Sequence, residues 1–171
     1  WTTASSAPSS SDGFITIRSG HTITVAENVT ADQVVIDAGG TVHVNSGVTL
    51  TIADNTGTGS DPVDCIVNGT IYVAGTLVPN GEFTFYRGSV YHHATDGGTI
   101  PAGDWDSESQ CRITGITATA PTGLGQSFGH FTWNCSSQSS ALTVSINNNI
   151  TIKGNLAITS TGAGKLALTS N

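Results

Sequence analysis

The sequence predicts an all-β fold, and specifically a single-stranded, right-handed parallel β-helix. Short runs of alternating β-branched residues recur along the 171-residue chain, separated by Gly or Asn-Gly turns. Strands this short cannot each carry a core, but they can when successive turns of chain stack about 4.8 Å apart along one axis. No segment has the 3.6-residue apolar period of a capped helix. A β-sandwich is the alternative fold.

The expected strands follow one another from residue 14 onward. The first group covers 14–17, 21–25, 34–36, 41–44, 48–52, 65–67, 70–73, 75–78 and 82–86. The second group covers 113–116, 131–133, 141–144, 150–152, 156–158 and 166–168. Turns such as Gly39-Gly40 and Asn68-Gly69 permit positive φ between them. At roughly 20 residues per turn, a usual solenoid period, the chain holds about eight coils.

The whole chain, residues 1–171, is expected to form one β-helix module. Residues 1–12 are polar and aperiodic, which is typical of a lead-in or cap over the first coil, whose open edge would otherwise invite aggregation. Residues 91–112 and 120–130 lose the strand pattern, so we expect two projecting loops there. The pattern still runs at 166–171, which suggests that further coils follow in a longer chain.

The composition limits both partners and location. Charged residues make up 10% of the chain, against the ~25% usual in globular domains. The net charge is −7 with five Lys plus Arg, which argues against nucleic acid and against dense polyanions as partners. No apolar run reaches the ~18 residues of a membrane-spanning helix. The uncharged, hydroxyl-rich sequence favours an extracellular or cell-surface protein.

The three cysteines suggest one disulfide. Cys111 and Cys135 lie 24 positions apart, close to one coil, so their Cα atoms are expected within the ~4.4–6.8 Å that a disulfide needs. Cys65 is left as a small buried apolar residue. Because the count is odd, three reduced thiols in the core remain the alternative.

Two other motifs could carry chemistry. The segment 54–64 contains Asp54, Asp61 and Asp64, whose oxygens suit a structural calcium ion; an ordinary exposed turn is the other interpretation. No other metal or cofactor is expected. The string 125–129 matches the G-x-S-x-G nucleophile motif, but no helix follows Ser127, so we interpret it as a loop and assign no catalytic residue.

Aromatic residues concentrate between 83 and 133, where they could bind a sugar. Tyr91 and Trp105 are the best candidates for exposed rings, and with His93 and Trp133 they make the predicted ligand site for a neutral glycan. In the other interpretation, which we favour, most of these rings fill or cap the solenoid.

Two stretches carry a family resemblance: the opening Ile15-Thr-Ile-Arg-Ser-Gly-His-Thr-Ile-Thr-Val25, and Gln126-Ser-Phe-Gly-His-Phe-Thr-Trp-Asn134. They resemble the repeats of large β-rich surface proteins of Bacteroidetes-type bacteria. The resemblance implies export by the type IX machinery and a place at the cell surface. Its motifs are turns and strand cores and specify no reaction.

Together these features predict a non-enzymatic extracellular module, an adhesin or a structural stalk. Its expected partners are glycans or other surface proteins. The alternatives are a neutral-glycan binding module and a carbohydrate-active β-helix enzyme, a class that parallel β-helices often host.

Overall fold

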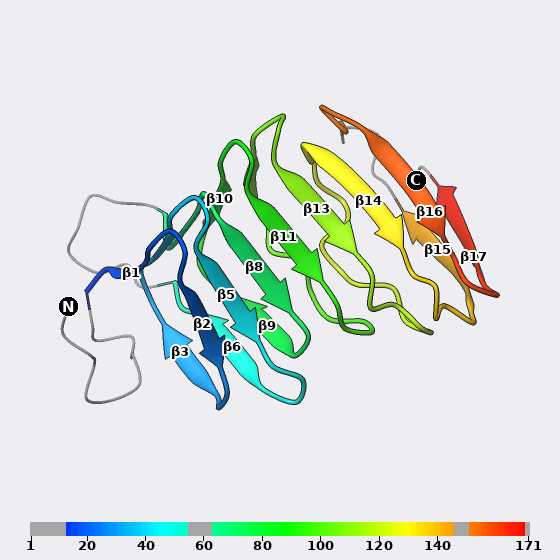
Figure 1. Ribbon diagram of the computed structural model, residues 1–171. Helices are drawn as coiled ribbons and strands as arrows, with labels where there is room; N and C mark the ends of the chain where they lie inside the picture. Colours follow the sequence, from blue (N-terminus) through cyan, green and yellow to red (C-terminus); the bar gives the residue numbers. More distant parts are fainter. Residues whose placement is uncertain (1–12, 55–62, 146–150, 170–171) are drawn as a thin grey trace.

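A computed structural model describes residues 13–54, 63–145 and 151–169 of the chain. The regular structure of these residues is β throughout, which confirms the predicted all-β class (Figure 1). Strands lie side by side and follow the chain in order from one end of the stack to the other. The described residues contain no helix long and apolar enough to cross a membrane. Residues 1–12, expected to form a cap, lie outside the described ranges.

The strands form four sheets. The longest contains β2 (Thr22–Val25), β5 (Thr41–Val44), β8 (Thr70–Val73), β11 (Val90–His93), β13 (Gln110–Ile113), β14 (His130–Asn134) and β16 (Leu156–Ser160). A five-stranded sheet contains β1 (Ile15–Ile17), β4 (Val34–Ile36), β7 (Cys65–Val67), β10 (Phe83–Phe85) and β12 (Gly103–Trp105). The smaller sheets contain β3 (Val29–Ala31), β6 (Thr49–Ile52) and β9 (Thr76–Pro79), and β15 (Ala141–Ser145) with β17 (Lys165–Thr169).

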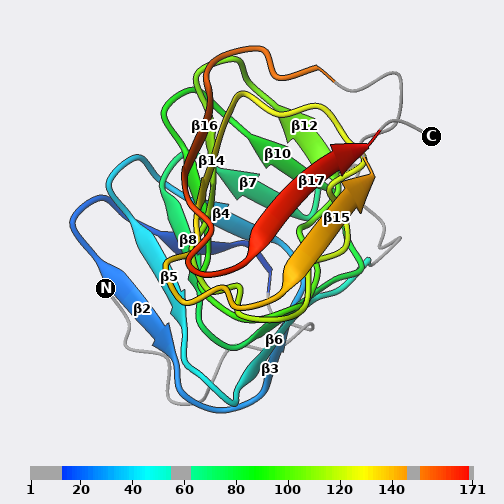
Figure 2. The same cartoon turned by 90° about the vertical axis from the view of Figure 1, so that its right-hand side faces the viewer.

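Every strand pair in these four sheets is parallel. Neighbours in a sheet come from successive turns of the chain, so each turn lies on the one before it, as in a β-solenoid. Viewed nearly along the stack, the sheets surround one interior (Figure 2). Parallel pairing of this kind does not fit the antiparallel β-sandwich that was the alternative prediction.

The length of a coil is read from the strand register. Ile15 pairs with Val34, 19 positions later, and Tyr91 pairs with Cys111, 20 positions later. At the C-terminal end Phe131 pairs with Leu156, 25 positions later. Coil length does not follow a trend along the chain, since Val34 pairs with Cys65, 31 positions later, and Cys65 pairs with Phe83, 18 positions later. Seven strands stack in the longest sheet, against the expected eight or so coils.

Glycine lets one turn sit closely on the next. A Cβ atom at Gly75 would lie 2.1 Å from the carbonyl oxygen of Asn45 and 2.3 Å from that of Val48. These oxygens belong to the turn one coil earlier. A Cβ atom at that distance would overlap them, so the position requires glycine. Gly69 is placed in the same way against the oxygens of Asp37 and Gly40.

The core changes character along the stack. The first three coils are filled mainly by Val and Ile, as at Ile36, Val44 and Val67, which are all fully buried. Further along, aromatic rings occupy the same inward positions: Phe85 stacks on Trp105 with ring centroids 3.8 Å apart, and Phe128 packs on Trp105 at 5.0 Å. The interpretation that most aromatic residues of 83–133 fill the interior is confirmed, with Tyr86 the exposed exception.

The expected loops at 91–112 and 120–130 do not project. Residues 91–112 run through β11, β12 and β13, and the second stretch bridges to neighbouring coils at Thr122 and Phe128. Alternating β-branched residues are missing here because the inward positions hold aromatic, His and Cys side chains. The pattern used to find strands is therefore hidden, while the coil continues.

Candidate functional site

The four residues predicted to bind a glycan are buried. Tyr91 and Trp133 are 0% exposed, His93 is 1% exposed and Trp105 is 2% exposed. A ring without exposed surface cannot stack on a sugar, so the expectation that Tyr91 and Trp105 are exposed is wrong. The physical reason is that all four lie on inward-facing strand positions.

Each buried tryptophan is paired with a glutamine side chain. Trp105 Nε1 donates to Gln126 Oε1 (3.1 Å), and Trp133 Nε1 donates to Gln138 Oε1 (2.9 Å). Gln126 Nε2 donates in turn to backbone oxygens of 101 and 123, and Gln138 Nε2 to those of 140 and 165. These side chains link neighbouring turns of the chain, which is a structural role.

His93 is likewise held inside the coil. Its Nε2 donates to the Gly97 carbonyl oxygen at 2.7 Å, and its Nδ1 lies 3.1 Å from the Tyr91 hydroxyl, which also lies 3.3 Å from the Thr99 carbonyl oxygen. Burial lowers the pKa of His93, and the Gly97 carbonyl opposes that shift. His93 is therefore a neutral histidine that orders the 94–99 turn.

Ser127 of the G-x-S-x-G string and the adjacent His130 accept hydrogen bonds from the backbone of the next coil. Ser127 Oγ accepts from the Thr151 amide at 2.9 Å, and Nδ1 of His130 accepts from the Asn155 amide at 2.9 Å. Nε2 of His130 faces Glu108 Oε2 at 3.9 Å. Among the described residues no hydrogen bond joins Ser127 to His130, in agreement with the loop interpretation of this string.

The predicted Cys111–Cys135 disulfide is not formed. Cys65, Cys111 and Cys135 are all free and buried. The coil repeats every 20 residues here, so Cys111 pairs with Phe131, and Cys135 lies four residues further along, about 13 Å at strand spacing. Cys135 Sγ donates instead to the Ile113 carbonyl (3.5 Å). Burial raises the pKa of all three thiols.

The predicted calcium site is described only in part and stays a prediction. Asp61 lies outside the described residues, Asp54 is exposed and Asp64 is buried. Asp64 Oδ2 accepts from the Glu82 amide at 2.7 Å. Burial raises the pKa of Asp64, and the negative charges of Asp32 and Asp54 raise it further. The hydrogen bond from the Glu82 amide lowers the pKa but does not outweigh these effects. The described residues hold no group of three side chains arranged to bind a metal ion.

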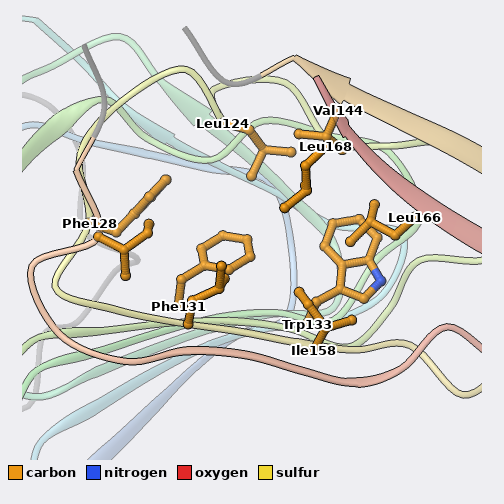
Figure 3. Close-up of a pocket in the computed structure, with 10 residues that line it drawn as sticks. Leu124, Phe128, Phe131, Trp133, Val144, Ile158, Leu166 and Leu168 are labelled. Carbon is orange, nitrogen blue, oxygen red and sulfur yellow. The ribbon is translucent and has the colours of Figure 1, made fainter. Parts of the chain in front are cut away.

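An apolar hollow lies at the C-terminal end of the coil (Figure 3). It encloses about 120 Å³ and is lined by Leu124, Phe128, Phe131, Trp133, Val144, Ile152, Leu156, Ile158, Leu166 and Leu168. These side chains come from the last two described coils and converge on one space. With no polar side chain among them, the hollow has nothing to orient a ligand. It continues the core.

The strongest surface feature is the outer side of the seven-stranded sheet, here called the ladder face. Strand register places Thr24, His43, Tyr72, His92, Arg112 and Thr132 in one row along the stack. Alternation sends these side chains outward while their neighbours, such as Val42 and Ile71, fill the core.

Three rings of the ladder face contact one another. Tyr72 lies edge to face with His43, with ring centroids 4.6 Å apart, and with His92 at 4.7 Å. Each ring is half-buried, which leaves part of its surface to solvent. Because the rings stand on successive strands, the sheet fixes their spacing and leaves them little rotamer freedom. The result is a rigid row of partly exposed rings.

His92, which lies between Tyr72 and Arg112 in the row, is neutral. Thr114 Oγ1 donates to the His93 carbonyl (3.4 Å), so it accepts from His92 Nε2 at 2.8 Å and leaves His92 Nδ1 as an acceptor. Burial, then Arg112, then His93 lower the pKa of His92. His92 therefore offers a hydrogen-bond acceptor beside a ring surface, a combination that suits a sugar hydroxyl.

Sequence reasoning missed this row, although a signal for it was present. His43 and Tyr72 occupy the third position of the runs Thr41-Val-His-Val44 and Thr70-Ile-Tyr-Val73. His92 and Arg112 follow Tyr72 at intervals of 20, which is the period of the coil. Aligning the chain on that period would have found the row.

No protein-family model, curated protein or solved structure matches the chain. The inference of function therefore rests on two features of the molecule itself. These are the stack of parallel coils and the ladder face that one of its sheets presents.

Proposed function

We propose that the chain is a non-enzymatic module of an exported surface protein, an adhesin or a structural stalk. In this proposal the stack is a right-handed, single-stranded parallel β-helix. The parallel pairing of successive turns supports it, because hydrogen bonds join each coil to the next along the whole stack. At about 4.8 Å per coil, seven coils make a rod roughly 30 Å long.

The charge-poor, Thr-rich sequence and the resemblance to bacterial surface proteins support the location. Protease shaving of intact producing cells tests it, with detection of peptides from residues 13–54 by mass spectrometry. We expect release from intact cells, with a cytosolic protein retained as the control. Peptides that become cleavable only after lysis would contradict the surface location.

A second function is favoured by the His43–Tyr72–His92 row: the ladder face binds a neutral glycan. Partly exposed rings at fixed spacing provide apolar surfaces for sugar rings, and the neutral His92 provides an acceptor for a hydroxyl. The row extends along the stack, so an extended polysaccharide would lie parallel to the axis. This site replaces the buried Tyr91, His93, Trp105 and Trp133.

Affinity electrophoresis in gels that contain neutral polysaccharides tests this binding. We expect Tyr72→Ala to lose retention by about tenfold or more, since removing one well-placed ring costs about 1.4 kcal/mol or more. Tyr86→Ala is the matched control, because Tyr86 is 49% exposed and lies off the ladder face. Equal retention of the two variants, or no retention of the wild type by any gel, would contradict the proposal.

A further inference from the structure

We propose that the ladder face also holds a carboxylate subsite, formed by Arg112, Gln110 and Thr132, for an acidic sugar. The inference rests on the proposed glycan binding and narrows its class. The ligand would be a largely neutral polysaccharide that carries isolated uronic acid residues, with the uronate at Arg112 and neutral sugars over the rings.

Gln110 orients Arg112. The Nε atom of Arg112 donates to Gln110 Oε1 at 3.0 Å, and Nη2 donates to the same oxygen. Because a guanidinium only donates, the amide oxygen of Gln110 must face it, and the amide Nε2 remains as a donor. The two side chains are on the same outer side of β13, two residues apart, so their free donors lie side by side.

The neighbouring strands complete the donor set. Arg112 is in register with Thr132 on one side and His92 on the other. The Thr132 side chain is half-buried on the outer side of β14 and adds a hydroxyl. An exposed guanidinium, an amide and a hydroxyl that share one small area match the acceptor-only oxygens of a carboxylate.

The charge distribution supports an anionic group at this point. The whole chain carries a net charge of −7, yet none of the seven strands of this sheet contains Asp or Glu. In the described part of the chain no carboxylate pairs with Arg112; Glu108, at the rim, faces His130 instead. Arg112 therefore leaves a positive charge on a face without negative side chains.

The same distribution argues for a sparse charge on the ligand. The chain has five Lys plus Arg in all, and Arg112 is the one that lies on a strand of this sheet. Beyond it along the row stand His92, Tyr72 and His43, which suit neutral rings. A dense polyanion would be attracted by one cation on this face and repelled by the net negative charge of the rest of the protein.

The inference is tested with matched ligands in isothermal titration calorimetry. The probes are xylo-, cello-, manno- and galacto-oligosaccharides, each with and without one glucuronic acid residue, together with polygalacturonate. The titrations are run at about pH 8, where His92, whose pKa burial lowers, is neutral beside Arg112. We expect the uronate-bearing form of the bound backbone to bind about tenfold more tightly than its neutral form.

Arg112→Gln separates the subsite from the rest of the face. We expect this variant to lose the preference for the uronate and to keep the affinity for the neutral oligosaccharide. Arg18→Gln removes the same charge from an exposed position between β1 and β2, and should keep the preference. Thermal unfolding of both variants checks that each is folded.

Each other outcome has a defined meaning. Equal affinity of the wild type for neutral and uronate-bearing forms, or a preference that survives Arg112→Gln, overturns the subsite and leaves glycan binding intact. Tighter binding of polygalacturonate that weakens equally in Arg18→Gln and Arg112→Gln indicates general electrostatic attraction and also overturns it. A wild type that binds no probe overturns both the glycan function and the subsite.

Discussion

Asp96 accepts three backbone hydrogen bonds from the next coil. Its Oδ1 lies 2.8 Å from the amide of Thr117, 2.9 Å from that of Ala118 and 3.0 Å from that of Thr119. Burial alone would raise the pKa of Asp96, but these bonds outweigh it and lower the pKa to about 2. The ionised carboxylate is thus the form that joins the two coils.

We predict that Asp96→Asn destabilises the fold in a pH-dependent way. Because the folded pKa lies below the ordinary value of 3.8, the stabilisation is complete above 3.8 and is lost as the pH falls through about 2. The substitution should cost about 1 kcal/mol at neutral pH, allowing for solvent screening at this exposed site. Urea unfolding from neutral pH down to about pH 2 measures it; a constant difference across that range would contradict the prediction.

Asp64 provides the opposite case in the same chain. Its folded pKa is raised, by burial first, so its contribution is complete below 3.8 and is lost as the pH rises through the folded pKa. Asp64→Asn keeps an oxygen for the Glu82 amide and removes the charge. We therefore expect this variant to be more stable than the wild type at neutral pH and equal to it in acid. The same urea series measures the change in unfolding free energy that each substitution causes at neutral pH. A loss of stability in Asp64→Asn would contradict the prediction.

At the scale of the elements, the turn glycines decide whether coils can stack. A Cβ atom at Gly75 would overlap the backbone oxygens of Asn45 and Val48, which cannot move without breaking the contact between coils. We predict that Gly75→Ala lowers the free energy of unfolding by about 2–3 kcal/mol. Gly13→Ala is the control, since a Cβ there meets no atom within 4 Å, and should stay within about 0.5 kcal/mol. Equal stability of the two variants would show that the turn can relax.

The elements that the sequence predicts well are those with β-branched cores. The strands expected at 34–36, 41–44, 65–67 and 70–73 have these bounds in the structure. Between 90 and 113 the inward-facing strand positions carry Tyr91, His93 and Trp105. An alternation of Val and Ile is therefore absent from this stretch of the sequence. Three strands were missed there because their buried positions hold aromatic, His and Cys side chains in place of Val and Ile.

The candidate site was predicted less well than the fold, for a related reason. Aromatic content alone does not say which side of a strand a ring occupies, and Tyr91 and Tyr72 differ in that one respect. The side is fixed by register, and register by the coil period, which varies between 18 and 31 residues along the chain. The Cys111–Cys135 prediction is wrong because it requires a coil of about 24 residues, whereas the coil at this point has 20.

At the scale of the whole molecule, a stack of coils is held together only by contacts between neighbours. Its stability is then close to a sum of coil and interface contributions, and the end coils open more easily than the middle. The first described coil exposes Phe14 (59%) and the last exposes Leu156 (51%), so the apolar residues of both gain less from burial than those inside. In the 171-residue polypeptide, opening should therefore begin at the end coils.

The three buried thiols measure this opening. Cys65 lies in β7 and Cys111 in β13, whereas Cys135 directly follows β14, next to the last described coil. Burial raises the pKa of each thiol, so labelling by iodoacetamide requires that the coil around it opens first. We predict that native-state labelling, followed by mass spectrometry, modifies Cys135 about tenfold faster than Cys65 or Cys111. In strong denaturant the three rates should converge, which excludes intrinsic differences between the thiols. Equal rates in the native protein would mean that all coils open in one cooperative step.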